Sequence, residues 1–172
     1  KYILFIGLIR KYKGVESLIK AFHYASKEHE NLKLIIAGEF YDDINIYKRL
    51  IKRKDLEDKV IIDNDFLKSS KIRDYICISD LIIQPYKKAS QSGITPLAYY
   101  YDKPLVVSNI EGLKEIIIED QSGEIFSETP ANMAIAIKNC INPESNRTYS
   151  NNIAKSKLKY SWLRFVKKVE AF

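Results

Sequence analysis

Three polar loops of this chain combine residue types that can bind a phosphate group. One of them, at 90–96, reads Ser-Gln-Ser-Gly-Ile-Thr-Pro and separates an apolar run from a helical pattern that begins at Ile94. A strand followed by small residues that open a helix leaves backbone N–H groups unpaired at the positive end of the helix, where an anion is stabilised. The alternative is that Ser90 or Ser92 only caps the helix and that Gly93 only permits the turn.

Basic side chains occupy another of these loops. Arg10, Lys11 and Lys13 directly precede a long helical pattern. The helix macrodipole disfavours cations at this end unless they share an anion. A solvated basic loop is the alternative. The third loop, at 108–115, is also polar, and a glycine opens the helix that follows it. Together the three loops predict an anion site at one edge of the fold.

Short apolar runs alternate with helical periodicity along the rest of the chain. The runs predict strands at 2–7, 32–38, 59–63, 80–85, 104–108 and 123–126. Apolar residues at i, i+3, i+4 and i+7 predict helices, first through Val15, Leu18, Ile19, Phe22 and Ala25, and then at 44–54, 70–78, 94–101, 113–118 and 130–141. Strands that are apolar on both faces are typical of a parallel sheet covered by helices. We therefore expect an α/β domain with a Rossmann-like parallel sheet of about six strands and ligands at their carboxyl ends.

Composition narrows the function classes. With 172 residues, of which 46% are hydrophobic, the chain can bury the core of a single domain. Its net charge of +6 would suit nucleic acid, an anionic membrane face or a phosphorylated ligand, but the cations are scattered and the charge alone does not decide between them. We expect no nucleic-acid partner. Cys77 and Cys140 lie in apolar helical patterns and are expected to be buried free thiols of a cytoplasmic protein. His23 and His29 suggest no triad or metal site and are expected at the surface.

Six short motifs follow one another in a recognisable order. They are Phe5-Ile6-Gly7 with Lys13-Gly14, Leu34-Ile35-Ile36-Ala37-Gly38, Ser79-Asp80-Leu81-Ile82-Ile83-Gln84-Pro85, Lys103-Pro104-Leu105-Val106-Val107-Ser108, Glu111-Gly112-Leu113-Lys114-Glu115 and Asp120-Gln121-Ser122-Gly123. This order resembles the C-terminal, donor-binding domain of group 1 glycosyltransferases, retaining enzymes of the GT-B fold related to family four. The resemblance implies that 1–172 is one nucleotide-sugar-binding domain and that an N-terminal acceptor domain lies outside this chain.

The resemblance also implies an activity and its residues. The expected reaction transfers a glycosyl group from a nucleotide-diphosphate sugar to a glycan or lipid-linked acceptor, as in bacterial cell-surface polysaccharide synthesis, in the cytoplasm and without a metal or cofactor. Lys13 has the family's place beside the diphosphate. The family's arginine after the first glycine is Leu8 here, so Arg10 is expected to supply the second cation, and Gln91 to contact the sugar. The donor-binding residues implied are Gly7, Gly38, Asp65, Phe66, Ser90, Ser92, Gly93, Ile94 and Thr95.

Two details of these loops carry their own expectations. Phe66 is expected to pack on a base or, as the favoured alternative, to plug the edge of the sheet. Glu115 is expected to order its own loop. The family's loop normally carries two glutamates eight residues apart, which contact the donor sugar and the ribose. Here the pair is Ala89 with Leu97 or Ser90 with Ala98, in a loop that resembles an Ala-Thr-Gln-Ser-Gly subgroup.

The missing glutamates leave two other functions open. One is a non-catalytic module that binds a nucleotide or a sugar, and the other is half of a GT-B sugar epimerase. The tail at 160–172 repeats Trp162, Phe165, Val166 and Val169 at helical spacing and predicts a helix that packs on the core or crosses to the N-terminal domain. Its basic faces suit a peripheral contact with the inner face of an anionic membrane that carries the acceptor.

Overall fold

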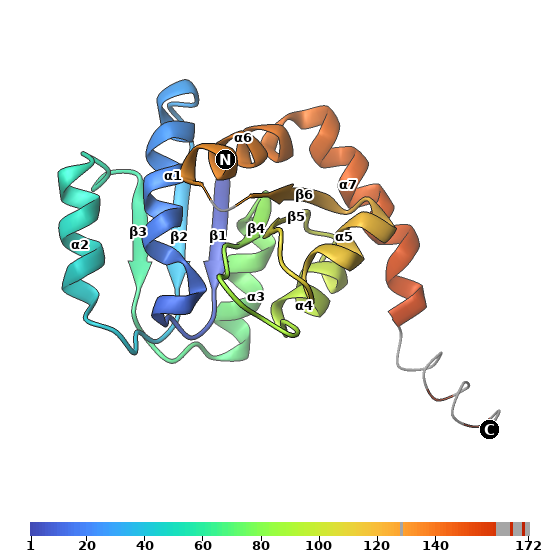
Figure 1. Ribbon diagram of the computed structural model, residues 1–172. Helices are drawn as coiled ribbons and strands as arrows, with labels where there is room; N and C mark the ends of the chain where they lie inside the picture. Colours follow the sequence, from blue (N-terminus) through green and yellow to red (C-terminus); the bar gives the residue numbers. More distant parts are fainter. Residues whose placement is uncertain (128, 161–165, 167–169, 171–172) are drawn as a thin grey trace.

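A computed structural model of the chain contains one parallel sheet with the strand order β3-β2-β1-β4-β5-β6 (Figure 1). It describes residues 1–127, 129–160, 166 and 170. The strands are β1 (Tyr2–Ile6), β2 (Lys33–Ala37), β3 (Val60–Asp63), β4 (Leu81–Gln84), β5 (Leu105–Ser108) and β6 (Gly123–Phe126). The parallel α/β sheet is confirmed, with each of the six strands within two residues of its predicted ends.

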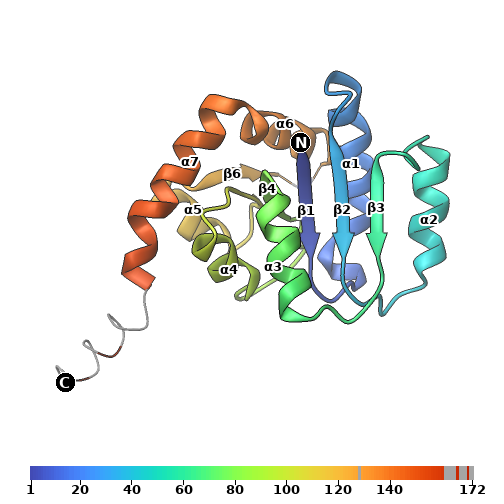
Figure 2. The same ribbon diagram turned by 180° about the vertical axis from the view of Figure 1, so that it is seen from behind.

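Helices cover both faces of the sheet (Figures 1 and 2). They are α1 (Val15–Glu28), α2 (Ile44–Arg53), α3 (Ser69–Ile78), α4 (Ile94–Tyr100), α5 (Lys114–Asp120), α6 (Pro130–Ile141) and α7 (Pro143–Ser156). Helix α1 packs against α2 and α6, and these lie in front of the sheet in Figure 1, whereas Figure 2 shows α3 and α4 on the opposite face. The chain therefore folds as a three-layer sandwich whose loops gather at the carboxyl ends of the strands.

The core lies on both sides of the central strands. Strands β4 and β5 are buried along their whole length, and β1 and β2 are buried after their first residue. Cys140 is buried as predicted, but the prediction for Cys77 was wrong because its side chain is exposed. Helix α3 is fully buried only at Ile76, so the thiol on the next residue faces solvent.

Helix α7 has no counterpart in the sequence prediction. Only Ile153 and Ser156 of this helix are buried, so its sequence has no apolar stripe from which a helix could be predicted. Its start does follow a recognisable rule, because the side chain of Asn142 accepts hydrogen bonds from the N–H groups of Glu144 and Ser145. In the part of the chain that the structure describes, no helix is both long and apolar enough to cross a membrane.

One buried carboxylate ties the segment after α7 to the sheet. Asp120 accepts hydrogen bonds from the hydroxyls of Tyr99 and Tyr160, each at 3.0 Å, and from Lys159 at 2.8 Å. Burial alone would raise the pKa of Asp120, but these donors outweigh it and hold the pKa below its ordinary value. Residues 157–160 form a short 3-10 helix (Lys157–Tyr160), and most of the tail predicted as a helix, including Trp162, lies outside the described residues.

Candidate functional site

The loops at the carboxyl edge of the sheet are pinned together by close backbone contacts. Gly14 has a left-handed backbone with a φ of 74°, and a Cβ at this position would lie 1.9 Å from the carbonyl oxygen of Pro85. The N–H of Lys87 donates to the carbonyl of Tyr12 at 2.8 Å. The loop after β1 therefore rests directly on the loop after β4, and only glycine permits that approach at position 14.

The loop after β5 joins this pair in the same way. A Cβ on Gly112, whose φ is 84°, would lie 2.2 Å from the carbonyl oxygen of Ser90. The N–H of Gly112 donates to a carboxylate oxygen of Glu115 at 2.8 Å, so the expectation that Glu115 orders its own loop is confirmed. Three loops that are far apart in sequence thus form one rigid rim.

An apolar hollow at this rim brings together four of the predicted donor-binding residues. It holds about 170 Å³ and is lined by Ile6, Gly7, Leu8, Gly38, Glu39, Phe66, Leu67, Ile72, Ile94 and Leu97. The Phe66 side chain is 82% exposed, so the expectation that it plugs the edge of the sheet was wrong. An exposed ring at the mouth of an apolar hollow is instead free to stack on a ligand.

The ammonium group of Lys13 lies over the face of an aromatic ring. Its Nζ lies 3.5 Å from the centre of the Tyr86 ring, and Tyr86 is almost completely buried. Burial also lowers the pKa of Lys13, because the charged ammonium loses part of its hydration. A cation held over an aromatic face and partly desolvated is a strong partner for an anion that approaches the rim.

Arg10 lies elsewhere on the same edge. Its guanidinium carbon is 4.6 Å from the centre of the Tyr41 ring. Both residues line a second, larger hollow with Lys11, Tyr12, Asp42, Lys87 and Lys88. We call this second hollow the basic hollow. Arg10 is absent from the lining of the apolar hollow, where Leu8 has the family's arginine position.

The loop before α4 shows how its polar residues are used. The Ser92 hydroxyl accepts a hydrogen bond from the N–H of Ile94, the first residue of α4, at 3.3 Å, whereas the N-cap position is Gly93 and has no side-chain capping bond. Thr95 is buried, and its hydroxyl accepts a hydrogen bond from the side-chain amide of Gln84 at 3.1 Å. This bond joins the start of α4 to the end of β4. Gln91 and Ser90 are exposed.

Gly93 does not adopt the backbone angles that favour glycine. Its φ is −64°, and a Cβ would meet no atom within 4 Å. The backbone at position 93 therefore does not require a glycine, and the space beside it is open. Asp65 is exposed in the loop after β3 and stays a prediction. Among the described residues, no group of three or more histidine, cysteine or acidic side chains is placed to hold a metal ion.

Sequence reasoning missed Tyr86 and Tyr41, the two rings on which the cations rest. The signal for Tyr86 was present, since it follows Pro85 at the end of an apolar strand and precedes two lysines. Tyr41 carried no such signal, because it meets Arg10 only through the pairing of Ile9 with Phe40 beyond the ends of β1 and β2.

Comparisons with known proteins agree with this architecture. Residues 1–157 match the family described as glycosyl transferases group 1. The chain is 30% identical over 171 residues to the uncharacterized glycosyltransferase MJ1607 of Methanocaldococcus jannaschii, covering 94% of this chain and 42% of that protein. It is 27% identical over 156 residues to the alpha-D-kanosaminyltransferase of Streptomyces kanamyceticus, covering 88% of this chain and 39% of that protein.

Solved structures share the fold. The C-terminal domain of the glycosyl transferase group 1 family protein LpcC from Francisella tularensis superposes with a TM-score of 0.84 at 20% identity, covering 94% of this chain and 86% of that one. Anabaena Alr3699/HepE, solved in complex with UDP and glucose, superposes with a TM-score of 0.82 at 16% identity, covering 99% of this chain and 48% of that one. The chain spans about two fifths of the length of the two relatives. From the match over residues 1–157 and the shared fold, the chain belongs to the group 1 glycosyltransferase family and has the fold of a C-terminal domain of that family.

Proposed function

We propose that this domain binds the nucleotide-diphosphate sugar of a retaining glycosyltransferase, which transfers the sugar to a glycan or lipid-linked acceptor in the cytoplasm. The observation that carries the proposal is the apolar hollow at the rim, which four predicted donor-binding residues line. Its size and apolar lining suit a flat base, with the exposed Phe66 ring at its mouth. Relatives solved with UDP support a nucleotide as the ligand.

Lys13 is the residue that we assign to the donor diphosphate. In the donor, the bond between the anomeric carbon of the sugar and the diphosphate oxygen breaks, and negative charge grows on the departing diphosphate. A fixed cation stabilises that charge more in the transition state than in the ground state. The Tyr86 ring holds the ammonium in place, so little reorganisation is needed at that moment. A divalent metal is not required for this role in the proposal, and we expect nucleotide affinity to be unchanged by a chelator.

Calorimetric titration with UDP, GDP and ADP tests the proposal. We expect one of these nucleotides to bind, and Lys13→Ala to weaken it by about 1–3 kcal/mol, the range for a hydrogen bond to a charged group. Lys20→Ala is the matched control, because it removes the same charge from α1 where Lys20 pairs with Glu16 on the surface. Failure of all three nucleotides to bind, or equal losses in both variants, would contradict the assignment.

A non-catalytic nucleotide-binding module is the second candidate, and one observation favours it. Leu97 lines the apolar hollow at a position where the family's pattern has a glutamate, and Ala89 has the other. The full-length protein with a labelled donor decides between the two functions. We expect a glycosylated product from the full-length protein and none from these 172 residues alone. Nucleotide binding without transfer by the full-length protein would establish the module instead.

A further inference from the structure

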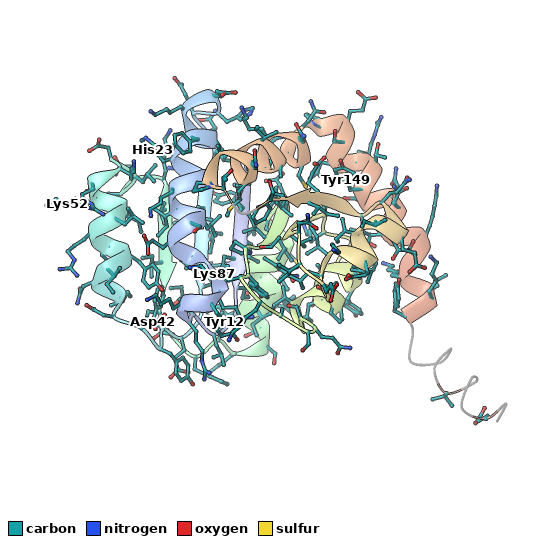
Figure 3. All side chains as sticks on the ribbon, in the orientation of Figure 1. Tyr12, His23, Asp42, Lys52, Lys87 and Tyr149 are labelled. Atoms are coloured by element: carbon teal, nitrogen blue, oxygen red, sulfur yellow. The ribbon has the colours of Figure 1, made fainter. Side chains whose placement is uncertain are left out.

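The basic hollow gathers cations from loops that follow two strands. Arg10, Lys11 and Tyr12 come from the loop after β1, Tyr41 and Asp42 from the loop after β2, and Lys87 and Lys88 from the loop after β4. Figure 3 shows the labelled side chains of Tyr12, Asp42 and Lys87 near the same end of α1. The hollow has a volume of about 620 Å³, which is several times that of the apolar hollow.

Positive charge dominates this hollow. Four cations line it together with one carboxylate, Asp42, which already accepts a hydrogen bond from the Tyr47 hydroxyl at 3.2 Å. The nearby acid Glu16 pairs with Lys20 at 2.7 Å, and the pKa of its carboxyl is lowered first by that hydrogen bond and, to a smaller extent, by the charges of Lys87 and Lys11. Within the described ranges, none of the four cations takes part in an ion pair. Like charges gathered in one concavity raise the local concentration of anions.

These cations are displayed from backbone that is already fixed. The N–H of Lys87 is bonded to Tyr12, and the N–H of Tyr41 donates to the carbonyl of Ile9 at 2.9 Å. The Arg10 guanidinium is stacked on the Tyr41 ring, which limits its rotamers while its N–H groups remain available. A ligand therefore meets a partly preorganised guanidinium at Arg10, which lowers the conformational entropy lost on binding, together with the exposed ammonium groups of three lysines.

We propose that the basic hollow binds a phosphate or diphosphate group of the acceptor substrate while the donor occupies the apolar hollow. This inference rests on the proposed function, and it assigns Arg10 to the acceptor, whereas the family pattern led us to expect it on the donor diphosphate. The two hollows share no lining residue, which is consistent with two separate ligands. A guanidinium fork combined with ammonium groups matches the geometry and charge of phosphate oxygens.

Two double variants and one single variant test the proposal by calorimetry on this chain. Inorganic pyrophosphate is titrated into the protein saturated with UDP, so that the donor site is already filled. We expect parent protein to bind pyrophosphate, and Lys87→Gln/Lys88→Gln to weaken that binding at least about tenfold while UDP affinity stays within about twofold. Lys13→Ala should show the reverse pattern. Lys52→Gln/Arg53→Gln removes two cations from α2 and should change neither affinity.

Three results would overturn the proposal. Saturating UDP could abolish pyrophosphate binding, which would make the basic hollow part of the donor site. The Lys87/Lys88 double variant could bind pyrophosphate like the parent, which would place the anion elsewhere. Third, the parent could bind vesicles of mixed phosphatidylcholine and phosphatidylglycerol but not pyrophosphate, which would identify a membrane contact. If pyrophosphate binds as expected and no nucleotide binds, the proposed function fails while the phosphate site stands.

Discussion

Replacing Gly14 with alanine tests whether the contact between the loops after β1 and β4 builds the site. The new Cβ would lie 1.9 Å from the carbonyl oxygen of Pro85, so one of the two loops must move. The left-handed backbone costs an L-residue about 1–2 kcal/mol, and forcing extra volume into a packed contact costs about 1–3 kcal/mol more. We expect Gly14→Ala to lower the free energy of unfolding by about 2–5 kcal/mol, part of the 5–15 kcal/mol typical of a domain.

The functional consequence follows from the neighbouring residue. Movement of Gly14 displaces Lys13 from the Tyr86 ring, and we expect UDP affinity to fall about tenfold, the equivalent of one charge-assisted hydrogen bond. Urea unfolding followed by circular dichroism gives the stability, and calorimetry gives the affinity. Gly93→Ala is the matched control for stability alone, because position 93 has a φ of −64° and open space around it. Equal unfolding midpoints for Gly14→Ala and the parent would refute the proposed role of this contact.

Three further perturbations probe other parts of the structure. Asp120→Asn should destabilise the fold by about 1–3 kcal/mol. The pKa of Asp120 is lower in the folded protein than its ordinary value of 3.8, so the parent should lose stability as pH falls from 3.8 through the folded-state pKa. The variant lacks this carboxylate and should lose less stability over the same pH range in acid denaturation. Parallel denaturation curves for the two proteins would contradict this. Gly93→Val should leave the circular dichroism spectrum unchanged but weaken UDP binding, since its side chain projects into open space beside the site; parental UDP affinity would return the loop to a capping role. A 2′-deoxy analogue of UDP should bind within about threefold of UDP, and a loss of tenfold or more by calorimetry would reveal an unrecognised ribose contact.

Strand and helix positions were predictable wherever the local pattern and the tertiary environment agree. Strand β4 is four consecutive buried residues, and its apolar run could hardly form anything else in an alternating α/β chain. Helix α7 was not predictable from periodicity, because its stability depends on a cap at Asn142 and on a few long-range contacts such as the bond from Asn146 to the carbonyl of Asp80. Cys77 was misplaced because an apolar neighbour within a helix does not say which side faces the core.

The candidate site, too, was predictable from the sequence only in part. Gly7, Gly38, Phe66 and Ile94 were expected at one edge because the carboxyl ends of parallel strands meet there, and they do line one hollow. The separation of Arg10 from that hollow could not be read from spacing, because it depends on where the Tyr41 ring lies. Side-chain direction at a loop is decided by neighbours that are distant in sequence, and a motif alone does not contain them.

Burial also decides which residues replace the two family glutamates. Ala98 is completely buried, so the pair of Ser90 with Ala98 cannot both face the site, whereas Leu97 lines the apolar hollow. The relevant pair is therefore Ala89 with Leu97. A leucine cannot accept a hydrogen bond from a ribose hydroxyl, and burying that hydroxyl without a partner would cost free energy. Nucleotide affinity must then come from the base in the hollow and from the phosphate near Lys13, which is why removal of the ribose 2′-hydroxyl should change it little.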